Sequence, residues 1–388
     1  MSERPRAKTG RAHRRLGLAV LGLCLCVQPM TAGAADVVSS GAGGDGYVYE
    51  ISRLTEHVHV IAQPEAFHLQ PLGNVTVVEQ TDGFVLVDAG GSRGAGERIV
   101  ELVRQIGDKP IKAVILTHWH GDHPLGVSAI LKIWPQARII STARTRAHLL
   151  GSSMQMFPRG DDAAANRSLQ DQIGAIADSF RASSDRAEAS AEERRGYAQA
   201  ERDLRRYARD LDGTTLALPG VTFTDQLSLP DEQAPVEALF LGRANTDGDA
   251  VAWLPNQRVL AAGDVVVAPF PFGFDSHPAE WLQVLDRLDR FDFAFLVPGH
   301  GAVQTDRTYL HAMKALIAST RSQAAALAAS GTSLQEARTR IDLAAHARRM
   351  VGDDPWLQHW FQLYWTDPMV ASVYGEATGR SAGDAEAR

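Results

Sequence analysis

Short apolar runs and amphipathic stretches alternate along the chain between residues 47 and 305. Apolar positions repeat on one side of residues 97–106, 124–134 and 279–288, which predicts helices there. Runs of β-branched and other apolar residues, broken by Gly, Pro and Asn, predict strands. These strands are expected at residues 58–61, 75–78, 84–87, 113–116, 138–140, 221–229, 238–241, 250–254, 258–261 and 293–297. Alternating strands and helices are typical of the α/β class.

Two regions depart from this alternation. Residues 161–212 are rich in Ala, Arg, Asp and Glu, contain no Pro and have few large apolar residues. We expect two helices that form an insertion and pack weakly on the core. This insertion acts either as a lid over the core or as a solvated arm without a role in substrate binding. Residues 306–376 are expected to form a helical C-terminal extension packed on the core.

The N-terminal 34 residues have the pattern of a secretory signal peptide. A basic stretch precedes an apolar run at residues 16–27, and small residues follow at 32–34. The apolar run is shorter than the roughly 20 residues that a membrane span needs. We therefore expect cleavage after Ala34, a periplasmic or secreted protein, and no stable membrane anchor once the signal is removed. The alternative is a lasting N-terminal anchor.

Composition narrows the possible functions. Of the 388 residues 45% are hydrophobic and 22% are charged, as in an ordinary globular protein. Removing residues 1–34 takes away six basic residues and one acidic residue, so the net charge falls from −7 to −12. This charge argues against a nucleic-acid partner. Both cysteines, Cys24 and Cys26, lie in the presumed signal, which excludes disulfides, thiolate ligands and cysteine nucleophiles from the mature chain.

The most informative chemistry lies at residues 117–123, directly after a predicted buried strand. This stretch contains three histidines and one aspartate. Imidazole and carboxylate groups are the natural ligands of zinc and similar ions. A single ion cannot easily take four ligands from so tight a loop, so two neighbouring metal ions are the simpler interpretation.

The sequence His118-Trp119-His120-Gly121-Asp122-His123 resembles the His-x-His-x-Asp-His signature of the metallo-β-lactamase superfamily. Further landmarks follow the family order over residues 47–305: Asp88, Asn245, Asp264 and His300. The resemblance implies an αββα sandwich, here with a helical insertion and a helical C-terminal tail.

The resemblance also implies a set of metal ligands. The set is His118, His120 and Asn245 for a first metal, Asp122, His123 and His300 for a second, and Asp264 between them. Asp88 would orient the histidine loop from behind. The family usually has histidine where this chain has Asn245, and an amide oxygen is a poorer zinc ligand than imidazole. We therefore expect zinc in one tight and one weaker site, with iron as the alternative metal.

The implied activity is hydrolysis of a small-molecule substrate by a metal-activated water, with Asp122 orienting the water and accepting its proton. The bond would be an amide or lactam, an ester or lactone, or a thioester. Two alternatives stay open: an oxidoreductase like the mono-iron persulfide dioxygenases, and a non-enzymatic binding protein on a decayed metal site. The sequence does not indicate the oligomeric state.

The remaining histidines carry weaker expectations. His277 precedes a predicted helix and follows an aromatic loop at residues 270–274, and His68 lies in an early loop. Either is a candidate to line the substrate cleft. His148 lies in a helical context and is expected to be solvated or to cap its helix.

Overall fold

The computed structural model describes residues 36–40, 49–63, 72–154, 163–274 and 276–378. The predicted signal peptide and His68 lie outside these described residues. Among the helices within them, none has both the length and the hydropathy that crossing a bilayer requires.

The first sheet has eight strands in chain order. The strands are β1 (Asp36–Ser40), β2 (Glu50–Arg53), β3 (Val58–Ala62), β4 (Val75–Gln80), β5 (Gly83–Val87), β6 (Ile111–Ile115), β7 (Arg138–Thr142) and β8 (Val221–Phe223). Neighbours are antiparallel from β1 to β5 and parallel from β5 to β8. The parallel pairs need crossover helices, and the chain supplies α1 (Arg93–Ile106) and α2 (Val127–Ile133) for the first two.

The second sheet has five strands in the order β13-β12-β11-β10-β9. Their bounds are β9 (Gln226–Leu229), β10 (Val236–Phe240), β11 (Ala250–Leu254), β12 (Val259–Val267) and β13 (Phe295–His300). Only the β12–β13 pair is parallel, and α6 (Pro278–Leu288) connects these two strands.

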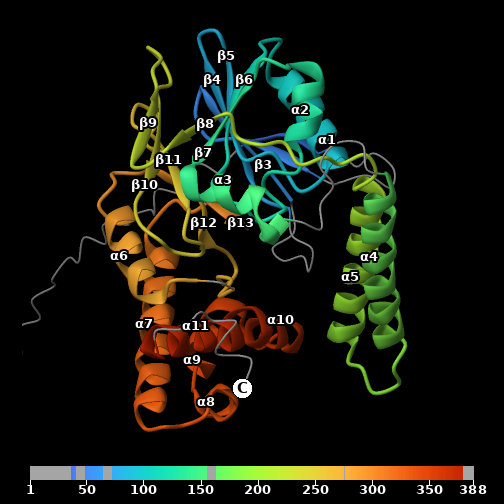
Figure 1. Ribbon diagram of the computed structural model, residues 1–388, viewed down its shortest axis with the longest axis vertical. Coiled ribbons are helices and arrows are strands. Elements are labelled where there is room, and N and C mark those ends of the chain that lie inside the picture. The colour runs from blue at the N-terminus through green and yellow to red at the C-terminus, as the bar shows by residue number, and fades with distance from the viewer. Residues whose placement is uncertain (1–35, 41–48, 64–71, 155–162, 275, 379–388) are drawn as a thin grey trace, which may run out of the picture. The chain divides into compact units, whose positions relative to one another are not determined.

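The two sheets face each other across an apolar layer that includes Val60, Ile115 and Val297. On the outer face of the first sheet, α1 and α2 bury apolar residues such as Ile99 and Ile130. The outer face of the second sheet is covered in the same way by α6 and by α7 (Thr308–Ala329) (Figure 1). The predicted αββα sandwich is confirmed.

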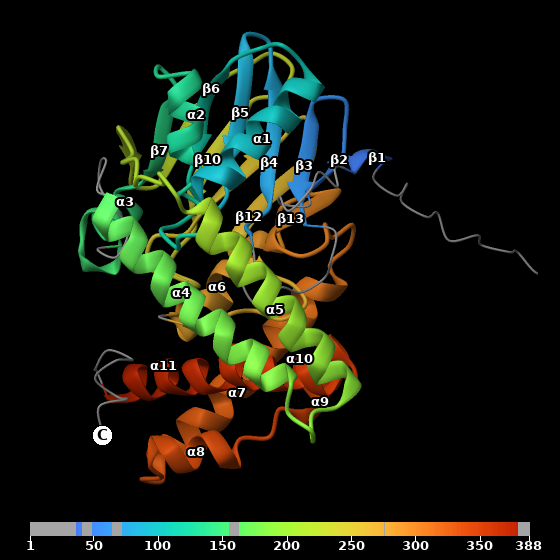
Figure 2. The ribbon, with the colours of Figure 1, turned by 90° about the vertical axis from the view of Figure 1, so that its right-hand side faces the viewer.

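The helical insertion consists of two long helices, α4 (Ala163–Ser184) and α5 (Ala191–Asp210). They lie side by side and extend towards the C-terminal helices (Figure 2). The insertion has few large apolar residues, but several of them are buried in the core. Leu204 and Tyr207 of α5 belong to the same apolar cluster as the buried residues of α1, so the packing is closer than expected. Nearer the start of α5, Gly196 lies against the ring of Trp356.

The C-terminal region is helical, as predicted. After α7 it contains α8 (Leu334–Arg340), α9 (Ala344–Val351), α10 (Pro355–Phe361), the π-helical turn η2 (Gln362–Thr366) and α11 (Asp367–Thr378). Trp360 and Trp365 are buried there against the second sheet's helices. The amide N–H of Gly273 donates to the carbonyl of Tyr364 (2.7 Å), so this region holds the aromatic loop at residues 270–274.

Two details differ from the sequence prediction. The run at 221–229 is two strands, because the chain crosses from the first sheet to the second at Thr224 and Asp225. The strand expected at 258–261 continues to Val267, past an irregularity at Gly263. The helical context expected around His148 is the short helix α3 (Ala143–Leu150), and the side chain of Thr142 caps its N-terminus.

Candidate metal centre

Side chains from both sheets meet at one end of the sandwich. The loop after β6 supplies His118, Asp122 and His123, β12 supplies Asp264, and β13 ends on His300. Their ligand atoms form two groups, one of His118, His123 and Asp264 and one of Asp122, His123 and His300. The second group is the set that the sequence predicts for the second metal. His123 belongs to both groups, so the two candidate metal positions are adjacent.

The spacing of these atoms fits a metal ion. The Nε2 atom of His123 lies 3.3 Å from Asp264 Oδ1 and 3.4 Å from Asp122 Oδ2, and His300 Nε2 lies 3.0 Å from Asp122 Oδ2. Two atoms bound to a tetrahedral zinc ion at about 2.1 Å lie roughly 3.4 Å apart.

Several of these buried ligand atoms have no hydrogen-bond partner within the described part of the chain. Among the described residues, nothing forms a hydrogen bond with the Nε2 atoms of His118, His123 and His300 or with Asp264 Oδ1. Leaving several buried polar atoms without partners is costly, and divalent cations at the two adjacent positions would satisfy them.

Asp88 fixes the histidine loop from behind. Its carboxylate accepts hydrogen bonds from the amide and the hydroxyl of Thr117 (both 2.8 Å) and from Nδ1 of His123 (2.8 Å). Since the Thr117 hydroxyl donates to Asp88, it accepts from Nδ1 of His118 (3.0 Å). In the neutral form of both imidazoles the lone pair therefore lies on Nε2, the atom that a metal would bind. Asp88 has φ +65°, a conformation that Asp and Asn tolerate better than most residues.

Asn245 is fully buried, and the protein determines how its amide is turned. The Nδ2 group donates to the carbonyl of Phe272 (2.8 Å). Oδ1 is buried and has no hydrogen-bond partner among the described residues. The amide thus carries one unpartnered oxygen, the atom that the sequence analysis expects on the first metal.

His120 belongs to neither of the two ligand groups. Its ring centroid lies 4.6 Å from that of His118 and 4.5 Å from that of Trp119. It is therefore beside the first metal position, next to the ring with which the sequence analysis pairs it.

The electrostatics of the centre favour the metal-binding forms of His118 and Asp264. Burial, and secondarily the nearby His123, hold the pKa of His118 well below its ordinary value, so this imidazole is neutral. Burial acts to raise the pKa of Asp264, but His300 and His123 outweigh it and keep the carboxyl ionised. For His123 burial is outweighed by the surrounding carboxylates, which raise its pKa well above the ordinary value, so a metal must displace a proton from this ring. For His300 burial is again outweighed, because Asp264 and Asp122 raise its pKa to about 9. A metal must therefore displace a proton from His300.

Backbone packing makes room for the ligands. A Cβ at Gly299 would lie 2.0 Å from Asp264 Oδ1, so only glycine allows this carboxylate its position. Asn74, directly before β4, donates to the carbonyls of Pro298 and Gly301 (both 2.9 Å) and so holds the segment that carries His300. The sequence analysis did not identify Asn74, because its partners lie more than 220 residues away.

A cavity of about 330 Å³ lies beside the centre. Its lining includes Trp119, His148, Arg243, Thr246, Asp247 and His277. His277 lines this cavity, and its assignment to a substrate cleft stays a prediction. His148 lies in the last turn of α3, in the expected helical context, and lines the same cavity. Trp119 and Arg243 were missed, because neither belongs to a motif and only the folded chain brings them together.

A buried cluster of imidazoles and carboxylates on an αββα sandwich is the architecture of a metallo-hydrolase. A family model for the metallo-beta-lactamase superfamily matches residues 70–300, more than half of the chain. The chain belongs to the metallo-beta-lactamase superfamily.

Individual relatives include two kinds of hydrolase. The chain is 25% identical over 247 residues to a linear primary-alkylsulfatase of Pseudomonas sp. (strain ATCC 19151), a match that covers 58% of this chain and 40% of that protein. It is 24% identical over 273 residues to a metallo-beta-lactamase type 2 of Bacillus sp. (strain 170), covering 69% and 81%. This chain thus spans less than half of the length of the alkylsulfatase.

A solved structure shares the fold over most of the chain. It is a stereoselective inverting sec-alkylsulfatase from Pseudomonas sp., with a TM-score of 0.57 and 16% sequence identity. The match covers 87% of this chain and 51% of that one.

Proposed function

We propose that this protein is an exported, zinc-dependent hydrolase that uses a metal-activated water. The observation that carries the proposal is the pair of ligand groups that share His123, whose buried ring nitrogens and carboxylate oxygens have the spacing of a zinc site. Divalent metal ions in such a site polarise the scissile bond and make hydroxide available near neutral pH.

The protein's own residues would position the reacting groups. Asp122 is partly exposed, with 16% of its side chain accessible, whereas His123 is fully buried. Asp122 is therefore the ligand that an entering water molecule can reach, and its carboxylate is placed to orient that water and accept its proton. Its pKa is held well below the usual range, because His123 and His300 outweigh the effect of burial.

The bond cleaved would be an amide or lactam, an ester or lactone, a thioester, or a sulfate ester as in the names of the two alkylsulfatases. An aromatic wall beside the centre supports a substrate with an apolar part. The ring of Phe272 lies 5.6 Å from that of His300, and Tyr364 packs against both Phe272 and the exposed Phe274.

The test has two stages. Metal quantification on the purified mature protein should find zinc, and a panel of lactams, lactones, esters, thioesters and alkyl sulfates should then identify a hydrolysed class. Bound redox-active iron with oxygen consumption on a persulfide would contradict the hydrolytic proposal. A zinc-loaded protein inert to the whole panel would instead favour a binding protein.

Export has a separate test. The N-terminus of the exported protein should be Ala35 or a residue very near it. Finding Met1 intact in exported material would contradict cleavage.

A further inference from the structure

The cavity beside the metal centre lies next to the first metal position. Trp119 stands between His118 and His120 in the chain, and its ring packs on His120 (4.5 Å). Thr246 directly follows Asn245. A substrate whose scissile bond lies at the metal centre could therefore place a neighbouring group in this cavity.

A guanidinium group is fixed in the lining. Arg243 Nε donates to both carboxylate oxygens of Glu280 (3.0 and 3.1 Å), and Nη2 donates to Oε1 as well. These contacts orient the planar group and use one of its edges. Among the described residues nothing accepts from Nη1, so a second edge remains for a ligand.

Further donors line the same cavity without acceptors. Neither the imidazole of His277 nor the indole N–H of Trp119 has a hydrogen-bond acceptor among the described side chains and carbonyls. Burial, and secondarily the charge of Arg243, lower the pKa of His277, so this ring is neutral and keeps one N–H.

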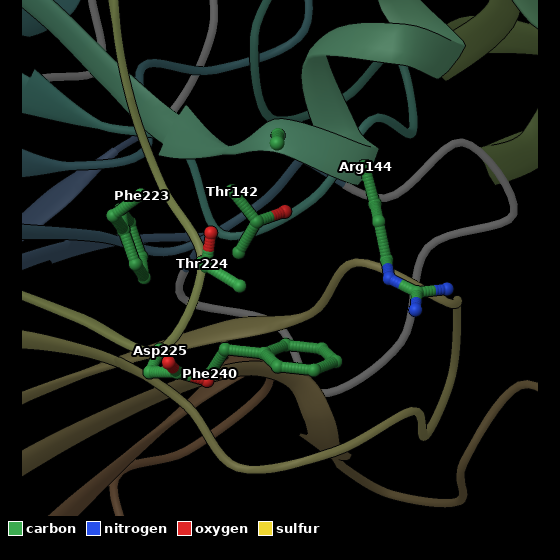
Figure 3. A pocket seen from close by; sticks show the side chains of 7 residues that line it. Thr142, Arg144, Phe223, Thr224, Asp225 and Phe240 are labelled. Atoms are coloured by element: carbon green, nitrogen blue, oxygen red, sulfur yellow. The ribbon is translucent and has the colours of Figure 1, made fainter.

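The one carboxylate in the lining already has partners. His148 Nε2 lies 2.9 Å from Asp247 Oδ1, and Arg144 Nη1 lies 3.7 Å from Asp247 Oδ2. The ring of His148 is also stacked on Trp119 (5.1 Å, 15° between planes). Arg144 itself belongs to a second cavity of about 300 Å³ between the sheets, where it lies over Phe240 (Figure 3). The hydrogen bond with His148 and the positive charge of Arg144 thus offset part of the repulsion that Asp247 would exert on an anion.

We propose that the cavity beside the metal centre is a subsite for an oxyanion group of the substrate, a carboxylate or a sulfate, with Arg243 as its main anchor. Counted over the described residues, the lining has more hydrogen-bond donors without a partner than acceptors without one. An oxyanion offers only acceptors, so it complements such a lining. This proposal deepens the proposed function by naming the substrate class, but the binding step does not require turnover.

Isothermal titration of the zinc-loaded full chain with hexyl sulfate, hexanoate and hexanol tests it. Either anion should bind more tightly than hexanol, and the ratio between the two anions assigns the group. The Arg243→Gln variant should bind the preferred anion about tenfold more weakly, since one charge-assisted contact is lost. Arg205→Gln is the matched control, because Arg205 is equally exposed and paired with carboxylates but lies on α5 outside the cavity.

The outcomes separate the two proposals. Equal binding of hexanol and both anions, or unchanged anion binding in Arg243→Gln, overturns the subsite. Tight anion binding that Arg243→Gln weakens, in a protein inert to the whole hydrolysis panel, supports the subsite and removes the proposed function. A thermal melt of Arg243→Gln close to that of the parent protein confirms that lost binding is not lost folding.

Discussion

At the scale of single residues, the centre depends on atoms whose partners are far away in the sequence. The histidine loop could be predicted as a ligand set because its residues are adjacent in the chain and follow a buried strand. The orientation of each ring could not be predicted, because it is set by Asp88 and Thr117. The same holds for Asn245. The motif predicts this residue as a ligand, but only the hydrogen bond from its Nδ2 to Phe272 shows that Oδ1 is the atom left for a metal.

Asn245 should make the centre asymmetric. Its neutral amide oxygen binds zinc less well than imidazole, so one zinc ion should bind tightly and a second only with excess metal. Because changes in supporting partners alone weaken metal affinity about 10–100-fold, Asn245→His should tighten the weak site by at least about tenfold. Competition titration with a chromophoric chelator measures both affinities.

The tight site provides the internal control for this variant. Its affinity should not change in Asn245→His, because Asp122, His123 and His300 remain in place. Two equally tight sites in the unmodified protein would show that the amide is not a metal ligand.

Asp88 should act on metal affinity without touching the metal. Asp88→Asn keeps the size and the tolerance of positive φ, but the amide's NH₂ group would face at least one of three donors. We expect zinc affinity to fall about 10–100-fold, measured by the same competition titration. Asp82→Asn, in an exposed turn paired with Lys112, should leave it unchanged. Equal affinities in the two variants would contradict the orienting role.

At the scale of elements, helices far from the centre hold the loops that form it. Gly273 is bound to Tyr364, and the Ser276 hydroxyl lies 3.3 Å from that of Ser372 in α11. The same loop provides the carbonyl that orients Asn245. The sequence predicted a helical C-terminal extension, but it contained no information on which loop these helices would contact.

The insertion offers a matched pair of glycines. A Cβ at Gly196 of α5 would lie 2.3 Å from the ring of Trp356, whereas a Cβ at Gly174 of α4 would meet nothing within 4 Å. Gly196→Ala should therefore separate α5 from α10 and destabilise the protein, by about 1–3 kcal/mol for an overpacked contact. Gly174→Ala should stabilise it by about 0.5–1 kcal/mol, since alanine is the better helix former. Denaturant unfolding measures both values.

Metal binding should be the same in both glycine variants, because the insertion contributes no residue to either ligand group. If Gly196→Ala abolished zinc binding as thoroughly as the loss of His120, the insertion would have a direct role at the centre.

At the scale of the whole molecule, the sandwich was predictable and its junctions were not. Most strands and the layer order follow from apolar runs and from the family motif. The crossing of the chain between sheets at Thr224 and Asp225 was missed, because no Gly or Pro interrupts the run there. The centre itself lies at such a junction: His118, Asp122 and His123 follow a strand of the first sheet, and Asp264 and His300 lie on the second.

Metal bound at this junction should stabilise the molecule as a whole, because it connects loops from both sheets. A ligand present at about 1,000 times its dissociation constant adds about 4 kcal/mol to the free energy of unfolding. For a chain of this size that corresponds to a rise in Tm of roughly 5 °C. Calorimetry after chelation should show a loss of this order, and the first equivalent of zinc should restore most of it, because the second site is weaker. In His300→Ala, which lacks a ligand of the tight site, the chelator should cause a much smaller loss. An unchanged Tm in the chelated parent protein would mean that the buried histidines and carboxylates satisfy one another without a metal, and that the two sheets are held by their apolar layer alone.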